Sequence, residues 1–410
     1  MLPAYTLAVL LLATFSSANV LPALPGLSEH TAIKVRSNLL QIATHSWELG
    51  TAAQALTELN ASSLSVFSPF TLPPPTRLDD RLNASASDVI NIATNIVRAL
   101  PVDSKVLVDG DGAVGDPASL GVAVLLANWT RTNLSDSSFS VAASQQLNHL
   151  LYVAPRNANG AISHREDQVQ LWADFVYMAP PFIAYYGALS TGDTSQSIDL
   201  LQEAYDQCRL YRDILRDADA GLWKHIVLGS GEQDLTHWGT GNAWAAAGML
   251  RVLETIRHSR VSSQFEAQKG NLTLWIDEIV GSAWKHQASQ SHERFLRSCV
   301  NIYSSQQTNG TLLNVLDDPR SFADSSSTAL LAAATFRLAS ITRDFSHVLP
   351  ATRAFQLIQQ SLDSDGWLLN TVDPLTFNTP SAPGVHSPEG QAFVLLLESA
   401  WRDLVASSII

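Results

Sequence analysis

Apolar stretches with helical spacing recur along nearly the whole chain, and they constrain its fold more than any other feature. We count about twelve such stretches of roughly 14–20 residues, separated by loops rich in Gly, Pro, Asn, Asp and Ser. Alternating patterns typical of strands are scarce, and no linker separates two halves. The 410 residues are 46% hydrophobic and 15% charged, which is enough for a large core. We therefore predict an all-α fold in a single domain over residues 19–410.

The predicted helices are defined by their residue ranges. The first, 29–59, is expected to be broken near Gly50. Asp116 and Pro117 are expected to cap and open a helix that runs to residue 130. The other predicted helices are 86–100, 139–153, 165–189, 194–218, 241–257, 272–286, 293–304, 325–338, 349–362 and 388–405. Residues 219–240 and 363–387 are predicted to be long loops.

A helical chain of this length commonly closes either as a solenoid or as a ring of helical hairpins. A solenoid shows a fixed sequence period, and none is present here. In a ring, the inner helices are apolar on all sides and the long loops gather at one mouth. The Ala-rich stretch 243–253 is suited to an inner helix. We therefore predict an (α/α)₆ toroid of six helical hairpins.

Charge and cysteine content limit the kinds of partner. The formal net charge is −13 without basic runs, which argues against nucleic acid and anionic membranes as partners. No His or Cys pair has the spacing of metal ligands, and Asp109 and Asp111 resemble a calcium loop only faintly. We expect no metal and no other cofactor. Whether Cys208 and Cys299 form a disulfide is left open.

The N-terminus predicts export. Residues 7–15 form an apolar core followed by small residues at 16–18, so residues 1–18 are predicted to be a signal peptide, although no Lys or Arg precedes that core. Six sites with the N-glycosylation pattern support this prediction: Asn60, Asn83, Asn128, Asn133, Asn271 and Asn309. We expect a secreted, glycosylated monomer.

Four segments carry most of the chemistry, namely residues 159–164, 171–182, 221–225 and 237–244. Each places Trp or His beside a carboxylate, an amide or a tight glycine. Aromatic faces stack on the C–H groups of sugars, and a few polar groups fix the orientation of the ring. These segments predict a sugar-binding pocket and an oligosaccharide substrate.

Segments 171–182, 221–225 and 238–244, with Ser-Pro-Glu-Gly-Gln-Ala-Phe at 387–393, resemble glycoside hydrolase family 105 in order and spacing. This is the unsaturated rhamnogalacturonyl hydrolase group, close to family 88. The resemblance extends from about residue 47 to residue 402. It implies an (α/α)₆ toroid that releases a terminal 4,5-unsaturated uronic acid from pectin-derived oligosaccharides, using water and no cofactor.

The resemblance places the acid/base residue at Asp174. Such an acid needs a raised pKa, which the apolar side chains of Trp172, Phe175 and Tyr177 could provide. Residues two apart do not share a helix face, so Trp172 and Asp174 can both line a pocket only near a helix end. The Pro180-Pro181 pair, which breaks a helix, makes such an end plausible.

The resemblance gives two further polar roles, each with a structural alternative. Asp116 corresponds to the second carboxylate of the family, but it can also simply cap the helix at Pro117. His164 and His225 match positions that contact the substrate, and the alternative for each is an ordinary structural histidine.

The other predicted substrate-binding residues are Trp172 and, in segment 237–244, Trp238, Thr240, Asn242 and Trp244. Trp238 and Trp244 match stacking positions, although ordinary core packing is an equal alternative for Trp244. Asn242 is expected to fix the turn between them.

Thr240 departs from the family pattern, in which many members have Arg at this position. An Arg fork grips a carboxylate, and Thr cannot replace its charge. His164, His225 or Lys224 could compensate. For Glu389, next to Pro388, a structural role in the first helical turn is favoured over a catalytic one.

Two alternative functions therefore stay open beside the unsaturated uronyl hydrolase. The first is an ordinary two-carboxylate glycosidase acting on a saturated glycan. The second is a non-catalytic relative that only binds carbohydrate.

Overall fold

Six helices form a closed inner ring. The computed structural model describes residues 24–75, 78–110, 112–298 and 310–408, and the predicted signal peptide lies outside them. Around the ring, each inner helix packs on the next, and the last packs back on the first. In order they are α2 (Ser46–Asn60), α5 (Gly121–Thr130), α8 (Pro180–Leu189), α10 (Gly239–His258), α12 (Ser325–Thr342) and α14 (Pro388–Ser408).

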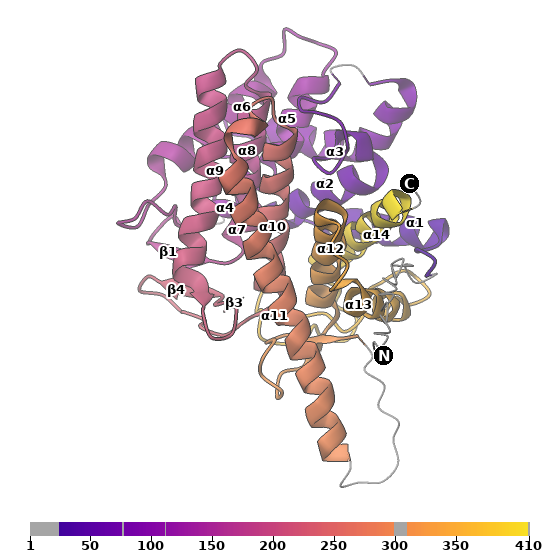
Figure 1. Ribbon diagram of the computed structural model, residues 1–410. Coiled ribbons are helices and arrows are strands. Elements are labelled where there is room, and N and C mark those ends of the chain that lie inside the picture. Colours follow the sequence, from indigo (N-terminus) through magenta and orange to yellow (C-terminus); the bar gives the residue numbers. More distant parts are fainter. Residues whose placement is uncertain (1–23, 76–77, 111, 299–309, 409–410) are drawn as a thin grey trace, which may run out of the picture.

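A second set of helices covers this ring from outside (Figure 1). Each outer helix precedes an inner one in the chain, so that outer and inner helices alternate as hairpins. The outer helices are α1 (Glu29–Ile42), α3 (Asp80–Ala99), α6 (Ser138–Asn148), α9 (Thr194–Leu215), α11 (Glu266–Ser298) and α13 (Val348–Gln360). The predicted (α/α)₆ toroid is confirmed.

Burial explains why particular helices take the inner positions. Helix α12 is buried on all sides from Ser325 to Ala339, because its Ala and Ser side chains let neighbouring helices approach closely. Helix α3 buries only Ala86, Val89, Ile92 and Ala93, which form a single stripe. Such a stripe is what an outer helix needs.

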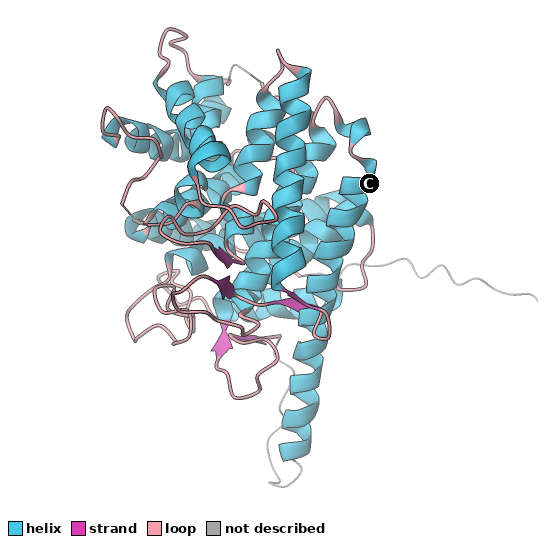
Figure 2. Cartoon of the chain, turned by 90° about the vertical axis from the view of Figure 1, so that its left-hand side faces the viewer, coloured by secondary structure: helices cyan, strands magenta, loops and turns pink. Residues whose placement is uncertain are grey.

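Short antiparallel ladders and long loops gather at one end of the ring (Figure 2). Strand β1 (Gln170–Trp172) pairs with β4 (Ile226–Leu228), β2 (Arg216–Asp217) with β3 (Leu222–Trp223), and β5 (Leu312–Leu313) with β6 (Ala323–Asp324). Short helical turns complete the described chain: η1 (Ser62–Leu64), α4 (Gly115–Ala118), η2 (His149–Val153), α7 (Phe175–Met178) and η3 (Ser262–Gln264).

One predicted helix boundary in the N-terminal half is wrong. The first helical segment breaks at residues 43–45 rather than near Gly50. The side chain of Glu48 accepts hydrogen bonds from the backbone N–H groups of Thr44 and His45, which starts α2 there. Gly50 lies inside α2, where an added Cβ would stand only 2.0 Å from the Ser119 hydroxyl oxygen. Its role is close packing.

Three other predicted helices differ from the structure. The predicted helix 165–189 is instead strand β1 followed by α7 and α8, because residues 170–172 pair with β4. Pro180 and Pro181 occupy the first turn of α8, where Pro is tolerated. The predicted helices 272–286 and 293–304 are one helix, α11, as far as Ser298, and residues 299–304 lie outside the described chain.

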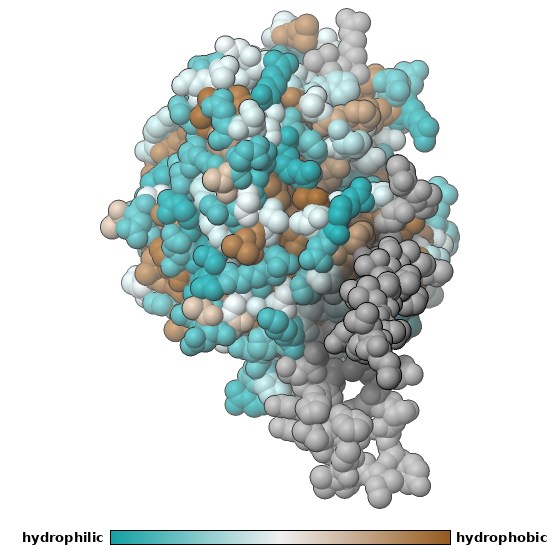
Figure 3. Space-filling view, viewed as in Figure 1, coloured by the Kyte–Doolittle hydropathy of each residue, from teal (hydrophilic) through white to brown (hydrophobic). Residues whose placement is uncertain are grey.

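The molecular surface mixes hydrophilic and hydrophobic residues, as the face in Figure 3 shows. Over the described residues, none of the helices combines the length and the apolar character that a membrane span requires. Cys208 is a buried free thiol, and Cys299 lies outside the described residues.

Candidate active site

The mouth loops and the inner helices enclose a cavity of about 240 Å³. Seven of the nine predicted site residues line it: Asp116, His164, Trp172, Asp174, Trp238, Thr240 and Trp244. The other two, His225 and Asn242, are buried directly behind its wall. Residues from 116 to 244 therefore converge on one hollow, as the motif segments predicted.

Asp174 lies between strand β1 and helix α7. The β1–β4 ladder pairs Trp172 with Ile226, and the N–H of Ala173 donates to the carbonyl of His225 at 2.9 Å. This register brings the two side chains together, so that His225 Nε2 lies 3.3 Å from Asp174 Oδ2. Trp172 and Asp174 both line the cavity because Trp172 ends a strand and Asp174 precedes a helix.

The pKa of Asp174 differs from the prediction. Burial raises the pKa of Asp174, but His225 and His164 lower it more, so that the net direction is below the usual value. The predicted raised pKa is therefore wrong for the free protein. Burial lowers the pKa of His225, but Asp174 and Asp234 outweigh burial and raise it. The proton of this pair thus rests on His225.

Asp116 and His164 form a second carboxylate–histidine pair that lines the cavity. His164 Nε2 lies 3.7 Å from Asp116 Oδ1, and the His164 ring stacks on Trp172 with centroids 4.8 Å apart. Burial lowers the pKa of His164 to about 4, so this imidazole is neutral at neutral pH. The predicted helix cap is wrong, since Val114 holds the N-cap position of α4 and Asp116 lies within its first turn.

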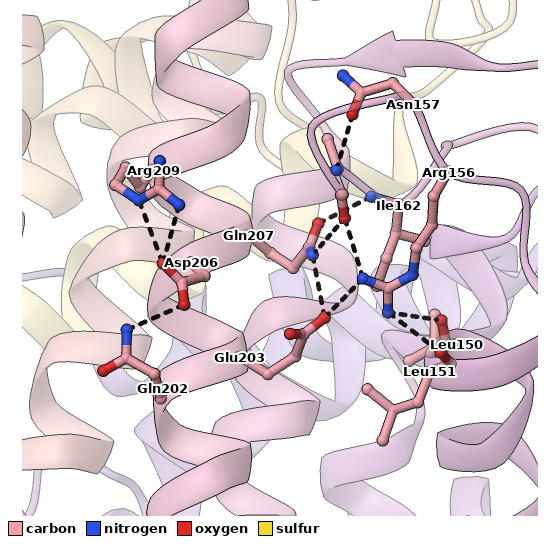
Figure 4. Close-up of polar contacts among 12 residues, drawn as sticks. Leu150, Leu151, Arg156, Asn157, Ile162, Gln202, Glu203, Asp206, Gln207 and Arg209 are labelled. Carbon is pink, nitrogen blue, oxygen red and sulfur yellow. Dashed lines mark hydrogen bonds and ion pairs between the residues drawn. The ribbon is translucent and has the colours of Figure 1, made fainter.

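A hydrogen-bond network on helix α9 holds the turn that leads into His164 (Figure 4). The side chain of Gln207 accepts from the N–H of Ile162 and donates to the carbonyl of Gly160. Arg156 donates to the same carbonyl and to Glu203. The turn 156–162 is thereby fixed against α9, and it positions His164 on the cavity wall.

Aromatic rings form the rest of the wall. The ring centroid of Trp238 lies 4.4 Å from that of His225, and its Nε1 donates to Asn314. Trp244 faces the cavity but also packs against Tyr177 and Phe393, so it has a core role as well. Wide apolar faces beside two carboxylates suit a sugar ring.

Asn242 fixes the start of α10, as predicted. Its side-chain oxygen accepts from the N–H of Trp223, and its Nδ2 donates to the carbonyls of Trp223 and Trp238. This ties the segment of His225 to the segment of Trp238.

The cavity has one guanidinium, that of Arg165, among its lining residues. Thr240 offers only a hydroxyl, which lies 3.4 Å from Asp324 Oδ2. Lys224, which we considered as a replacement for the family Arg, is not among the lining residues. Arg165, the residue after His164 in sequence, therefore places a cation at the cavity, whereas Thr240 does not.

Glu389 also lines the cavity, in the first turn of α14 as predicted. It is a third carboxyl group beside Asp116 and Asp174. Trp47 Nε1 and the Ser387 hydroxyl donate to its two oxygens. Burial, and secondly the charge of Glu48, raise the pKa of Glu389 to about 7.

Sequence reasoning missed Arg165 and Asp234 and gave Glu389 a structural role only. Glu389 lies in the quoted 387–393 motif, so its position carried a signal, but first-turn geometry explained it equally well. Asp234 lies in a segment that we predicted to be loop. No spacing rule connects it to His225, because the contact depends on the β4 hairpin.

Comparisons with known proteins show the family and the fold. The chain is 24% identical over 207 residues to the unsaturated rhamnogalacturonyl hydrolase YesR of Bacillus subtilis (strain 168), an alignment that covers 48% of this chain and only 52% of YesR. It thus spans about half the length of that curated relative.

Two solved structures share the fold. A possible member of the GH105 family from Klebsiella pneumoniae subsp. pneumoniae MGH 78578 superposes with a TM-score of 0.68 at 17% identity, over 91% of this chain and 92% of that one. An unsaturated glucuronyl hydrolase specific for heparin superposes with a TM-score of 0.56 at 14% identity, over 92% and 96%. The model of Glycosyl Hydrolase Family 88 matches residues 118–376, which is more than half of the chain, and the protein therefore belongs to that family.

Proposed function

We propose that this protein is an unsaturated uronyl hydrolase that removes a terminal 4,5-unsaturated uronic acid from pectin-derived oligosaccharides of the rhamnogalacturonan type. Family membership and the name of the Bacillus subtilis relative support the reaction class. The observation that carries the proposal is the meeting of Asp174, Asp116 and His164 with four tryptophan side chains in one sugar-sized cavity.

In the proposed reaction, Asp174 as carboxylic acid protonates C4 of the vinyl ether. An oxocarbenium-like centre forms at C5, and water adds to it. The hemiketal opens and releases the sugar to which it was attached. The Asp174 carboxylate accepts the proton lost by the water, and the acid is regenerated. No cofactor takes part, and general acid catalysis of this kind contributes roughly 10²–10⁴-fold to the rate.

For the substrate carboxylate we assign Arg165 as the binding group. Its guanidinium has a long ion pair of 3.9 Å with Asp167, and it is partly exposed at the cavity. An Arg at this place can hold a carboxylate through two parallel hydrogen bonds. Thr240 cannot supply such a contact.

The test is hydrolysis of lyase-digested pectin. The reaction is measured as loss of the ultraviolet absorbance of the conjugated double bond. We expect loss with the wild-type protein and essentially none with Asp174→Asn, while the thermal unfolding temperature stays close to wild type. Reducing sugar released from intact saturated glycans, with no loss of absorbance on any lyase product, would instead indicate an ordinary glycosidase. Binding of oligosaccharides without either reaction would indicate a non-catalytic relative.

We further propose that the protein is secreted as a monomer. The apolar segment at residues 7–15 and the N-glycosylation sites support export. The test is expression of the full chain in a eukaryotic host, with N-terminal sequencing of protein from the medium and its mass in solution. A mature N-terminus near residue 19 and a monomer mass are expected, whereas retention in the cytosol or a dimer mass would overturn the corresponding half of the proposal.

A further inference from the structure

His225 lies between two carboxylates, one on each ring nitrogen. Its Nε2 lies 3.3 Å from Asp174 Oδ2, and its Nδ1 lies 2.9 Å from Asp234 Oδ2. The histidine side chain is 1% exposed, and those of Asp174 and Asp234 are 14% and 12% exposed. The three groups therefore form a line in which the buried imidazole joins Asp174, which lines the cavity, to Asp234, which does not.

The backbone fixes this line rigidly. The N–H and carbonyl of Ile226 exchange hydrogen bonds with Asp234, and the N–H of His225 donates to the carbonyl of Thr236. The other carboxyl oxygen of Asp234 accepts from the N–H of Thr236 at 3.0 Å. Asp234 therefore has one oxygen held by backbone and the other facing the imidazole.

We propose that Asp234 is a positioning residue, which holds His225 with a proton on Nδ1 so that Nε2 delivers and recovers the proton used by Asp174. This rests on the proposed function, since it concerns the proton of the same reaction. Asp234 does not line the cavity, and it acts through His225.

The proton that the reaction uses starts on His225, and a proton from water replaces it there. At rest His225 is an imidazolium with one N–H toward Asp234 and one toward Asp174, and Asp174 is a carboxylate. The Nε2 proton moves to Asp174 Oδ2, which leaves a neutral imidazole whose Nδ1–H still bonds to Asp234. Asp174 gives this proton to C4 of the substrate. When water adds at C5, Asp174 takes a proton from it and passes it back to Nε2.

The other charged groups around His225 are few. His164 lies near Asp174, and it is itself next to Asp116 and Arg165. The remaining neighbours of the imidazole are the rings of Trp172, Trp238 and Phe377. Among the described residues packed on His225, Asp174 and Asp234 are the carboxylates in direct contact with it. Removing the charge of either one should therefore change the pKa of His225 measurably.

The test is Asp234→Asn, which keeps the size of the side chain but removes its charge. We expect kcat to fall by roughly 10²-fold or more, as for other carboxylates that orient a catalytic histidine. The alkaline limb of the pH profile of kcat should move down by about one pH unit or more, because His225 loses a stabilising charge. KM should change little. An unchanged kcat and an unchanged alkaline limb would overturn the proposal.

Asp317→Asn is the matched control. Asp317 Oδ2 makes the same kind of contact, at 2.7 Å, with Nδ1 of His237, and neither residue lines the cavity. This variant should keep the wild-type pH profile. If it shifts the profile as much as Asp234→Asn does, the effect is general and the proposal fails.

A nitrogen NMR titration of the His225 ring in the full wild-type chain tests the same point without substrate. Protonation of both nitrogens at neutral pH, lost at lower pH in Asp234→Asn than in the wild type, supports the proposal. A neutral ring at neutral pH in the wild type overturns it, even if Asp234→Asn does not fold. If the wild type proves inactive on unsaturated substrates, the proposed function fails, whereas an active wild type with an unaffected Asp234→Asn variant refutes only this inference.

Discussion

The hydroxyl of Thr240 lies 3.4 Å from Oδ2 of Asp324, the residue that caps helix α12. Asp324 already accepts from the N–H groups of Ser326, Ser327 and Val372. Position 240 is therefore part of a polar contact between α10 and α12 and presents no charge to the cavity. Arg165, which lines the cavity, is therefore the residue that we propose for binding the substrate carboxylate.

Replacing Arg165 by Gln should raise KM for an unsaturated uronyl substrate by about tenfold and should lower kcat/KM by at least as much. The substrate carboxylate is bonded to C5, the carbon at which the oxocarbenium-like centre forms, so a contact with Arg165 holds the bound substrate and also acts next to the reacting carbon in the transition state. Steady-state kinetics on lyase products measures both constants. Arg165→Lys keeps the charge and should recover part of the loss, while an unchanged KM in Arg165→Gln would remove Arg165 from the binding site.

Glu389 makes stability depend on pH. Its pKa is raised from 4.5 to about 7 by burial and by Glu48, so the folded state binds the proton more tightly than the unfolded state. The free energy of unfolding should therefore fall as pH rises from about 4.5 to about 7, by up to about 3 kcal/mol. In Glu389→Gln, which stays neutral, this part of the fall should disappear.

Urea unfolding of wild type and Glu389→Gln at pH 5 and pH 8 measures the effect as a difference between the two proteins. Replacing the exposed Glu232 by Gln is the control, and it should leave the pH dependence as in the wild type. Equal pH dependence in Glu389→Gln and wild type would mean that Glu389 has the same pKa in the folded and the unfolded state.

The sequence predicted the fold well because long apolar stretches with good helix formers, such as the Ala-rich α10, alternate with loops rich in Gly, Pro and Asn. It also predicted which aromatic and acidic residues meet, since the motif segments lie next to the mouth. It did not predict the short ladder of β1 with β4, because strands this short have no periodicity. The contacts of His225 with Asp174 and Asp234 depend on that ladder, so the charge state of Asp174 was missed as well.

The predicted glycosylation sites differ in exposure. Asn83 and Asn133 are exposed, while Asn128 is half-buried and its side-chain oxygen is buried without a hydrogen-bond partner. Protein made in a eukaryotic secretory pathway should carry glycans on Asn83 and Asn133 and little on Asn128, because the fold has to accommodate the attached sugar. Peptide mass spectrometry after enzymatic deglycosylation gives the occupancy of each site. Full occupancy of Asn128 in folded protein would contradict this expectation.

A buried ion pair ties three inner helices together inside the ring. Arg337 of α12 donates to Glu58 of α2 at 2.8 Å and also pairs with Asp403 of α14. The side chains of Arg337 and Glu58 are 6% and 4% exposed, so removing either one leaves the other charge buried. Replacing Arg337 by Met should lower the free energy of unfolding by about 3–5 kcal/mol.

The double variant Arg337→Met with Glu58→Met distinguishes the contribution of the ion pair to stability from the contribution of side-chain packing. It removes both buried charges, so it should be more stable than Arg337→Met alone, even though it changes more atoms. Because both residues lie outside the catalytic cavity, activity at low temperature should stay near that of the wild type. If the double variant instead loses the sum of the two single losses, the two side chains stabilise the ring independently, through their packing rather than through their charges.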